Sequence, residues 1–351
     1  MATLLLLLPP ATLAVEQCSL NGVLLPSGQC QCDPGWSGPR CSALAVAQSR
    51  VLWPQLSDGD PRSVDSSSLS WGGSLLRDHS TGLWHGWFNA GCQTPTSFMH
   101  TFRTGAVHAV ASDVSGPYGF VDVSVPGELE NPMAASDGEG GVLIAYLDHA
   151  WPNGSALNLA MPCFGASNGT EAGATPRPSE PAPFPRPLCA TLQPESHAPD
   201  PKIEGRRLAI ARAPSMSGPW TYHYPKISKP DWQADKDGDI ECGINPSLTK
   251  LSNGTWLLAT RYDHPISNRS HLTLATAPSW RGPYTVVSSG LQWAEGVATG
   301  GSEDPVVYKN ERGYHMIHHD GPHGRHVWSK DGLSWDGYTE PTSSQDQSTD
   351  A

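Results

Sequence analysis

The 351-residue chain has little charge, no basic runs and few long apolar stretches. Charged residues make up only 16% of it, and 34 acidic residues outnumber 22 basic ones, which gives a net charge of −12. The absence of Lys/Arg-rich runs argues against nucleic acid or an anionic membrane as a partner. No segment after the first residues is long enough to span a bilayer. A G-x-S-x-G elbow, a P-loop and a dinucleotide fingerprint are also missing, so serine-nucleophile and nucleotide chemistry have no support.

Glycine, proline and tryptophan are plentiful, with 36, 33 and 13 copies. This mixture is typical of many short strands joined by tight turns, and it does not suit long helices. The composition therefore predicts an all-β fold.

The first residues, MATLLLLLPPATLAVEQC, combine an apolar core with small residues near Ala14. This pattern predicts a secretory signal peptide over residues 1–14, and the alternative of a membrane anchor is too short to span a bilayer. The chain has eight cysteines, which suits an oxidising compartment. We expect a secreted glycoprotein, with N-x-[ST] acceptor sites at Asn153, Asn168, Asn253 and Asn268.

A cysteine-rich segment, CSLNGVLLPSGQCQCDPGWSGPRC, follows the signal peptide. Its closing C-x-C-x5-G-x2-C spacing resembles an EGF-like domain, which we place at residues 16–42. EGF domains usually pair six cysteines one-three, two-four and five-six, and here both partners of the first bridge are missing together. The resemblance therefore implies the disulfides Cys18–Cys30 and Cys32–Cys41. We expect either a rigid docking module or a contact site for a cell-surface protein.

The rest of the chain repeats one pattern of an Asx-Pro corner, a strand, a polar turn and a second strand. A strand, a Gly-Pro-aromatic turn and another strand alternate with it, at 108–120, 208–222 and 272–286. The spacing is 59 residues from Gly72 to Asn131 (131 − 72) and again from Asn245 to Asp304 (304 − 245). The repeats of the first pattern are NPMAASDGEGGVLIAYLDH (131–149), NPSLTKLSNGTWLLATRYDH (245–264) and DPVVYKNERGYHMIHHDG (304–321), with a Gly-containing variant at 71–91.

A repeating four-strand unit of this length is typical of a β-propeller blade. We predict a five-bladed β-propeller over residues 51–340, with four complete blades. A fifth blade is expected to begin at 324–338 and to remain incomplete, with residues 44–66 as a source for a closing strand. Residues 341–351 are expected to form a disordered tail.

A Pro-rich segment at about 160–205 interrupts the repeat. Because Cys163 and Cys189 bracket it, we interpret it as a surface insertion closed by a Cys163–Cys189 disulfide. A degenerate extra blade is the alternative.

The ordered series of motifs resembles the five-bladed propellers of glycoside hydrolase family 43, and more narrowly secreted proteins that join an EGF-like module to such a propeller. The likeness covers roughly residues 65–337. In these hydrolases an Asp base, a pKa-tuning Asp and a Glu acid typically stand at the inner-strand starts of blades one, two and three. The motifs that carry the resemblance are Trp71-Gly72-Gly73, Cys92, the H-A-V-x-S-x5-G-P-Y run from His108, Glu303-Asp304-Pro305, His315 and the S-x-D-G-L-S-W run from Ser329.

The family's acids do not transfer to their usual places. The blade-one corner is Gly72, so the resemblance leaves the base without a counterpart, and hydrolysis is doubtful. An inverting enzyme needs two carboxyls about 6.5–9.5 Å apart, one of them protonated. The candidate catalytic residues are Glu303, Asp304 and Glu241.

Structural roles compete with these catalytic ones. Asp304 occupies a corner that Asn131 and Asn245 occupy elsewhere, and an Asx residue before proline can shape its own turn. No turn rule requires Glu303, so we favour it as a sugar-binding carboxylate over a catalytic acid.

We expect polar side chains from several blades to surround one rim and to bind a poly- or oligosaccharide. Trp71 is the candidate aromatic platform, although blade tryptophans also serve as core. The same group of polar side chains could instead bind zinc, which is the weaker interpretation because no compact ligand motif is present. The candidate substrate-binding residues are Glu130, Asn131, Asn245, His149, His264, His318 and Trp71.

The segment DWQADKDGDIEC places acids at alternate positions, as in a calcium-binding loop. Calcium at Asp235, Asp237 and Asp239 is one reading and a solvated acidic loop is the other; no further cofactor is expected. The end of the segment supplies Cys242, which either pairs with Cys92 or leaves two free thiols.

Two functions follow from these patterns. The first is a glycan-directed secreted protein that resembles family 43 glycosidases and has weak or doubtful hydrolytic activity. The second is a non-catalytic carbohydrate-binding or adhesion protein with the EGF-like module as its contact.

Overall fold

The computed structural model describes ten stretches of the chain and divides it into two compact units. The central unit comprises Arg50–Leu291 with Glu303–Pro305, and the terminal unit comprises Met1–Ser49, Gln292–Ser302 and Val306–Ala351. The predicted signal peptide, the Pro-rich insertion with Cys163 and Cys189, and the C-terminal tail lie outside the described residues. The described residues are 18–45, 68–92, 105–116, 118–125, 129–149, 206–228, 244–264, 269–289, 302–320 and 323–337.

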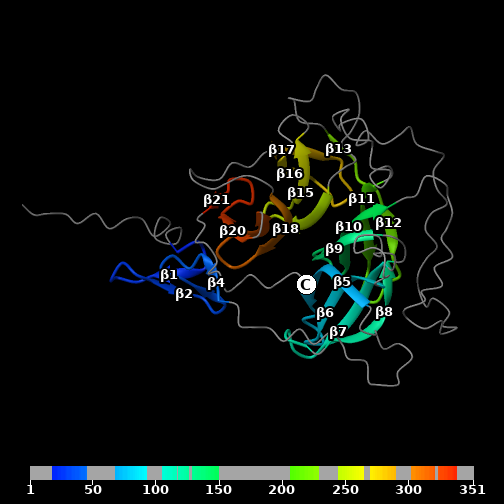
Figure 1. Cartoon of the computed structure of the whole chain (residues 1–351), viewed down its shortest axis with the longest axis horizontal. Helices are drawn as coiled ribbons and strands as arrows, with labels where there is room; N and C mark the ends of the chain where they lie inside the picture. Colours follow the sequence, from blue (N-terminus) through cyan, green and yellow to red (C-terminus); the bar gives the residue numbers. More distant parts are fainter. Residues whose placement is uncertain are drawn as a thin grey trace, which may run out of the picture. The chain divides into compact units, whose positions relative to one another are not determined.

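The central unit contains three sheets, two of four strands and one of five, each with four consecutive antiparallel strands (Figure 1). We call them blades one, two and three. The fifth strand of blade three lies at its outer edge, since β13 (Ile227–Ser228) pairs in parallel with β17 (Tyr284–Ser289). Blade one consists of β5 (Ser68–Arg77), β6 (Trp84–Cys92), β7 (Ala106–Ala111) and β8 (Gly119–Val125). Blade two consists of β9 (Leu129–Ser136), β10 (Val142–His149), β11 (Arg206–Ala213) and β12 (Thr221–His223), and blade three of β14 (Ile244–Lys250), β15 (Trp256–His264), β16 (Arg269–Ala277) and β17 (Tyr284–Ser289).

Two hydrophobic clusters join neighbouring blades of the central unit. Trp87 and Trp220 lie in the cluster between blades one and two. Leu143, Trp256 and Tyr284 lie in the cluster between blades two and three. Full burial of one such side chain stabilises the fold by about 1.5–3 kcal/mol, so each blade depends on its neighbour for a large part of its stability.

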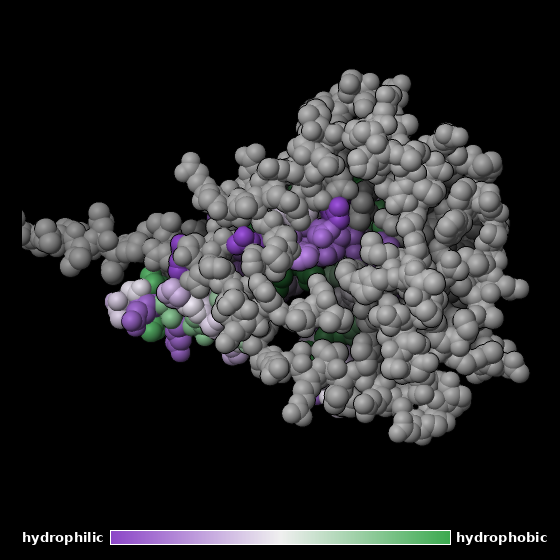
Figure 2. All heavy atoms as spheres, in the orientation of Figure 1, coloured by the Kyte–Doolittle hydropathy of each residue, from purple (hydrophilic) through white to green (hydrophobic). Residues whose placement is uncertain are grey.

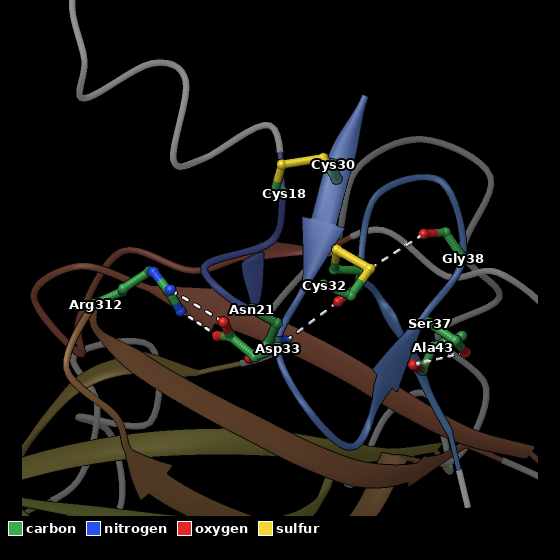
Figure 3. The surroundings of a disulfide bond; sticks show 10 residues. Cys18, Asn21, Cys30, Cys32, Asp33, Ser37, Gly38, Ala43 and Arg312 are labelled. Carbon is green, nitrogen blue, oxygen red and sulfur yellow. Dashed lines mark hydrogen bonds and ion pairs between the residues drawn. A yellow bond between two sulfur atoms is a disulfide. The ribbon is translucent and has the colours of Figure 1, made fainter. Parts of the chain in front are cut away.

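The terminal unit combines two small hairpins with a fourth blade. The hairpins are β1 (Gly22–Leu24) with β2 (Cys30–Cys32) and β3 (Trp36–Ser37) with β4 (Ala43–Leu44). Two disulfides, Cys18–Cys30 and Cys32–Cys41, staple them (Figure 3). This is the pairing that the EGF resemblance implies.

The expected start of a fifth blade is wrong. The residues from 323 onward form the outer two strands of blade four, in the order β18-β19-β20-β21. The described residues therefore form four blades in an all-β, propeller-like fold. The error arose because this segment lacks the Gly-Pro-aromatic turn that marks the outer strands of the other blades; its turn is built on Asp331 instead. The strands are β18 (Ser302–Lys309), β19 (Tyr314–Asp320), β20 (His323–Ser329) and β21 (Asp336–Gly337).

Candidate site at the inner-strand bulges

In blades one, two and three the first strand shifts its register against the second strand at its Asx-Pro or Gly corner. In blade one the register against β6 shifts between Trp71 and Gly73. Equivalent shifts fall at the Asn131 and Asn245 corners of blades two and three. The corners are thus β-bulges inside strands, whereas the sequence suggested turns.

The corner residue has a left-handed backbone conformation in all four blades. Gly72, Asn131, Asn245 and Asp304 have φ values of 61°, 51°, 53° and 53°. In this conformation a Cβ lies too close to the following carbonyl oxygen, which glycine avoids because it has none. Asparagine and aspartate tolerate the conformation because their short polar side chains can form local hydrogen bonds. The bulge geometry therefore explains why these positions alternate between Gly and Asx.

Within the central unit the four bulge residues meet. The Asn131 side-chain amide donates to Asn245 Oδ1 at 2.5 Å and faces Asp304 Oδ1 at 3.4 Å. The Asn245 amide donates to the same Asp304 oxygen at 2.6 Å. A Cβ on Gly72 would lie 2.8 Å from Asn131 Oδ1. We call these four residues the bulge cluster.

Asn131 and Asn245 are buried, with 8% and 7% exposed, whereas Asp304 is partly exposed and Gly72 is exposed. Two amide N–H groups, from Asn131 and Asn245, point at one oxygen of Asp304. An inverting hydrolase needs one protonated acid and one ionised base with a water between them. Asp304 is placed as an acceptor for neighbouring blades, and Gly72 offers no carboxyl opposite it.

Glu303 forms an ion pair with Arg261. Arg261 lies on β15 opposite Ile244, next to the blade-three bulge. The two side chains are 26% and 29% exposed, so the pair reaches solvent. Sequence reasoning found Glu303 but missed Arg261. The available signal was its register, because Asn89 and Leu147 occupy the same place in blades one and two.

Other polar residues near the strand ends lie inside the fold. Asn89 is buried and donates to the Leu129 carbonyl at 2.8 Å. Asp148 is buried and accepts the Tyr224 hydroxyl at 2.8 Å. In the terminal unit, His318 is 1% exposed. Glu130, one residue before the blade-two bulge, is partly exposed.

Several predicted residues lie outside what the structure describes. The side chains of Trp71, Cys92, His149 and His264 are among them, although their backbones are in strands. So are the blade-three acid Glu241, the calcium candidates Asp235, Asp237 and Asp239, the partner Cys242, and the acceptor sites Asn153, Asn168 and Asn268. Of the four acceptor sites the structure describes Asn253, which is exposed in the β14–β15 turn.

A family model for the Teneurin-like EGF domain matches residues 15–43. This match covers both hairpins and both disulfides of the terminal unit, and such disulfide-stapled modules are typical of extracellular proteins. No curated protein matches the sequence. Among the described residues, no helix has the length and apolar character needed to cross a membrane.

Solved structures that are similar to this chain include glycoside hydrolases, among them members of family 43. An endo-1,4-beta-xylanase from Bacteroides thetaiotaomicron shares 11% identity with a TM-score of 0.45, covering 78% of this chain and 76% of that one. A family 117 glycoside hydrolase from Zobellia galactanivorans shares 11% identity with a TM-score of 0.46, over 78% and 72%. A family 43 β-xylosidase/α-arabinofuranosidase from a compost metagenome, in complex with xylotriose, shares 10% identity with a TM-score of 0.45, over 77% and 76%.

Proposed function

We propose that this chain is a secreted, glycan-directed binding protein that does not hydrolyse its ligand. The bulge cluster carries the proposal. One oxygen of Asp304 faces the amides of Asn131 and Asn245, and the fourth position, Gly72, contributes no side chain. These residues hold blades together, and they leave no opposed pair of carboxyls within the cluster.

Polar groups beside the cluster provide the recognition chemistry. Glu303 and Arg261 are paired yet partly exposed, and Glu130 is partly exposed one residue before Asn131. Carboxylate and guanidinium groups both form directional hydrogen bonds, which suits sugar hydroxyls. The family resemblance of the sequence motifs supports sugar as the ligand class. Trp71 as a stacking platform and calcium at Asp235–Asp239 stay predictions.

Adhesion through the EGF-like module is the second candidate function. Its apolar side chains Val23, Leu25 and Leu44 are 49%, 37% and 38% exposed. Figure 2 shows hydrophobic atoms in green beside hydrophilic ones in purple on this module. Exposed apolar groups on a small stapled module suit a protein partner.

The test is a binding and release assay on a broad panel of plant and algal polysaccharides, with and without EDTA. It compares the wild type with Glu303→Gln, Glu241→Gln and the exposed control Glu311→Gln. We expect no release of sugar, and binding to at least one glycan that Glu303→Gln weakens about tenfold and Glu311→Gln leaves unchanged.

Two results would overturn the proposal. Sugar release that Glu303→Gln or Glu241→Gln abolishes would make the protein a hydrolase with displaced acids. Neither release nor binding across the panel would refute the glycan function and leave adhesion as the surviving candidate.

A further inference from the structure

Strand pairing gives the four blades a common frame. The second strand of each blade starts at Trp84, Val142, Trp256 and Tyr314, and the next residue points to the opposite face of the sheet. On the same face, the third strand contributes a residue that lies two positions from the direct pairing partner of that residue. The resulting pairs are His85 with His108, Leu143 with Ile210, Leu257 with Leu274, and His315 with His326.

In blades one and two this face is covered by the blade that follows in the chain. On blade one, Trp87 stacks on His108 with ring centroids 4.9 Å apart, and it meets the edge of Trp220 from blade two at 6.4 Å. On blade two, Leu143 and Ile210 belong to the hydrophobic cluster shared with blade three. We call this surface the following-blade face.

On blade four the EGF-like module covers the following-blade face. The Trp36 ring lies 4.4 Å from the His326 ring and 6.1 Å from the His315 ring. The Asn21 amide lies 3.5 Å from His326 Nε2. His315 and His326 are 0% and 5% exposed, so the module buries this face as a blade would.

A second set of contacts joins the module to the β18–β19 turn of blade four. Arg312 forms an ion pair with Asp33 (Figure 3). The Asn310 amide donates to the Leu20 carbonyl at 3.1 Å. The Leu20 side chain is fully buried, and a Cβ on Gly313 would lie 2.7 Å from it. The module is therefore closely packed against the turn as well as the sheet.

We propose that the EGF-like module takes the place of a fifth blade on blade four, with Trp36 as its anchor. A blade cannot bury both of its faces alone, so each needs a neighbour on its following-blade face. Here a disulfide-stapled module supplies the apolar cover that another four-stranded sheet would supply. The module is then an integral part of the terminal unit, and its Trp36 side is unavailable to an outside partner. This proposal does not depend on the ligand of the central unit.

Hydrogen–deuterium exchange on the full chain tests the proposal, read on peptides from β19 and β20. Trp36→Ala should raise their exchange rates at least tenfold. The matched control Val23→Ala alters an exposed residue of the same module and should leave these rates unchanged. Intact mass after alkylation of free thiols confirms that both disulfides remain in each variant.

A second variant keeps the test decisive if Trp36→Ala unfolds the module itself. Arg312→Gln changes only blade four, and loss of its partly exposed ion pair should raise the same exchange rates about threefold. Unchanged protection of β19 and β20 in Trp36→Ala with folded disulfides, or in Arg312→Gln, would overturn the proposal. In both variants glycan binding should stay at the wild-type level, so failure here is separate from failure of the proposed function.

Discussion

Replacing Gly72 by alanine tests whether the bulge cluster is a tightly packed structural element. Gly72 has φ +61°, and an alanine there adopts a left-handed conformation that costs about 1–2 kcal/mol. Its Cβ would also lie 2.8 Å from Asn131 Oδ1, so the Asn131 side chain has to move. That movement weakens its hydrogen bond to Asn245, which is worth about 1 kcal/mol. The expected loss in the free energy of unfolding is therefore about 2–3 kcal/mol.

Urea unfolding measures this loss, with Gly82→Ala as the matched control. Gly82 lies in the same blade, has φ +76°, and has nothing within 4 Å of the added Cβ, so it reports conformational strain alone. Gly72→Ala should cost about 1 kcal/mol more than Gly82→Ala. In the double variant with Asn131→Ala, the two changes should cost at least 0.5 kcal/mol less than the sum of the single variants, roughly the lower end of coupling between contacting residues. Equal costs for the two glycines would refute the contact with Asn131.

The same geometry bears on catalysis. Gly72→Asp supplies the carboxyl that the family 43 pattern has in blade one, but Asn131 occupies the space that it needs. We therefore expect this variant to lose stability without gaining hydrolytic activity.

Two further predictions concern titratable groups. Burial lowers the pKa of His315 to about 4 and of His326 to about 3, from 6.5, so both are neutral in the folded chain. Their contribution to stability is complete above pH 6.5 and declines as the pH falls toward 4 and 3. Between pH 8 and pH 5 the urea midpoint should therefore drop by the equivalent of about 2 kcal/mol per histidine. The double variant His315→Leu/His326→Ile, which carries the residue pair of blade two, should show a shallower decline. Asp137 is buried and accepts hydrogen bonds from backbone N–H groups and from Arg212. Asp137→Ala should therefore lower the free energy of unfolding by about 2–3 kcal/mol, whereas Glu139→Ala, which changes an exposed neighbour, should lower it by less than about 0.5 kcal/mol. Similar losses in the two variants would contradict this structural role of Asp137.

The sequence by itself determined the features that depend on neighbours along the chain. The cysteine spacing between Cys18 and Cys41 carries the EGF resemblance, and that resemblance implied both bridges, which join residues 12 and 9 positions apart. The 59-residue period located the first strand of each blade, since strand and turn patterns are written in local residue order. The same period does not reveal that residues 323–337 complete blade four, because the blade to which a strand belongs depends on which strands pair.

Only the tertiary structure decided the contacts between distant residues. Asn131 and Asn245 are 114 positions apart, and their side chains meet because the bulges of two blades turn them toward each other. Arg261 and Glu303 are 42 positions apart and belong to strands of different blades, so their pairing also depends on how the blades assemble. Trp36 and His326 come together because a sheet face needs a cover, and the stapled module buries that face. Whether a sheet face is buried depends on how the sheets assemble, so it cannot be deduced from the pattern of a single strand.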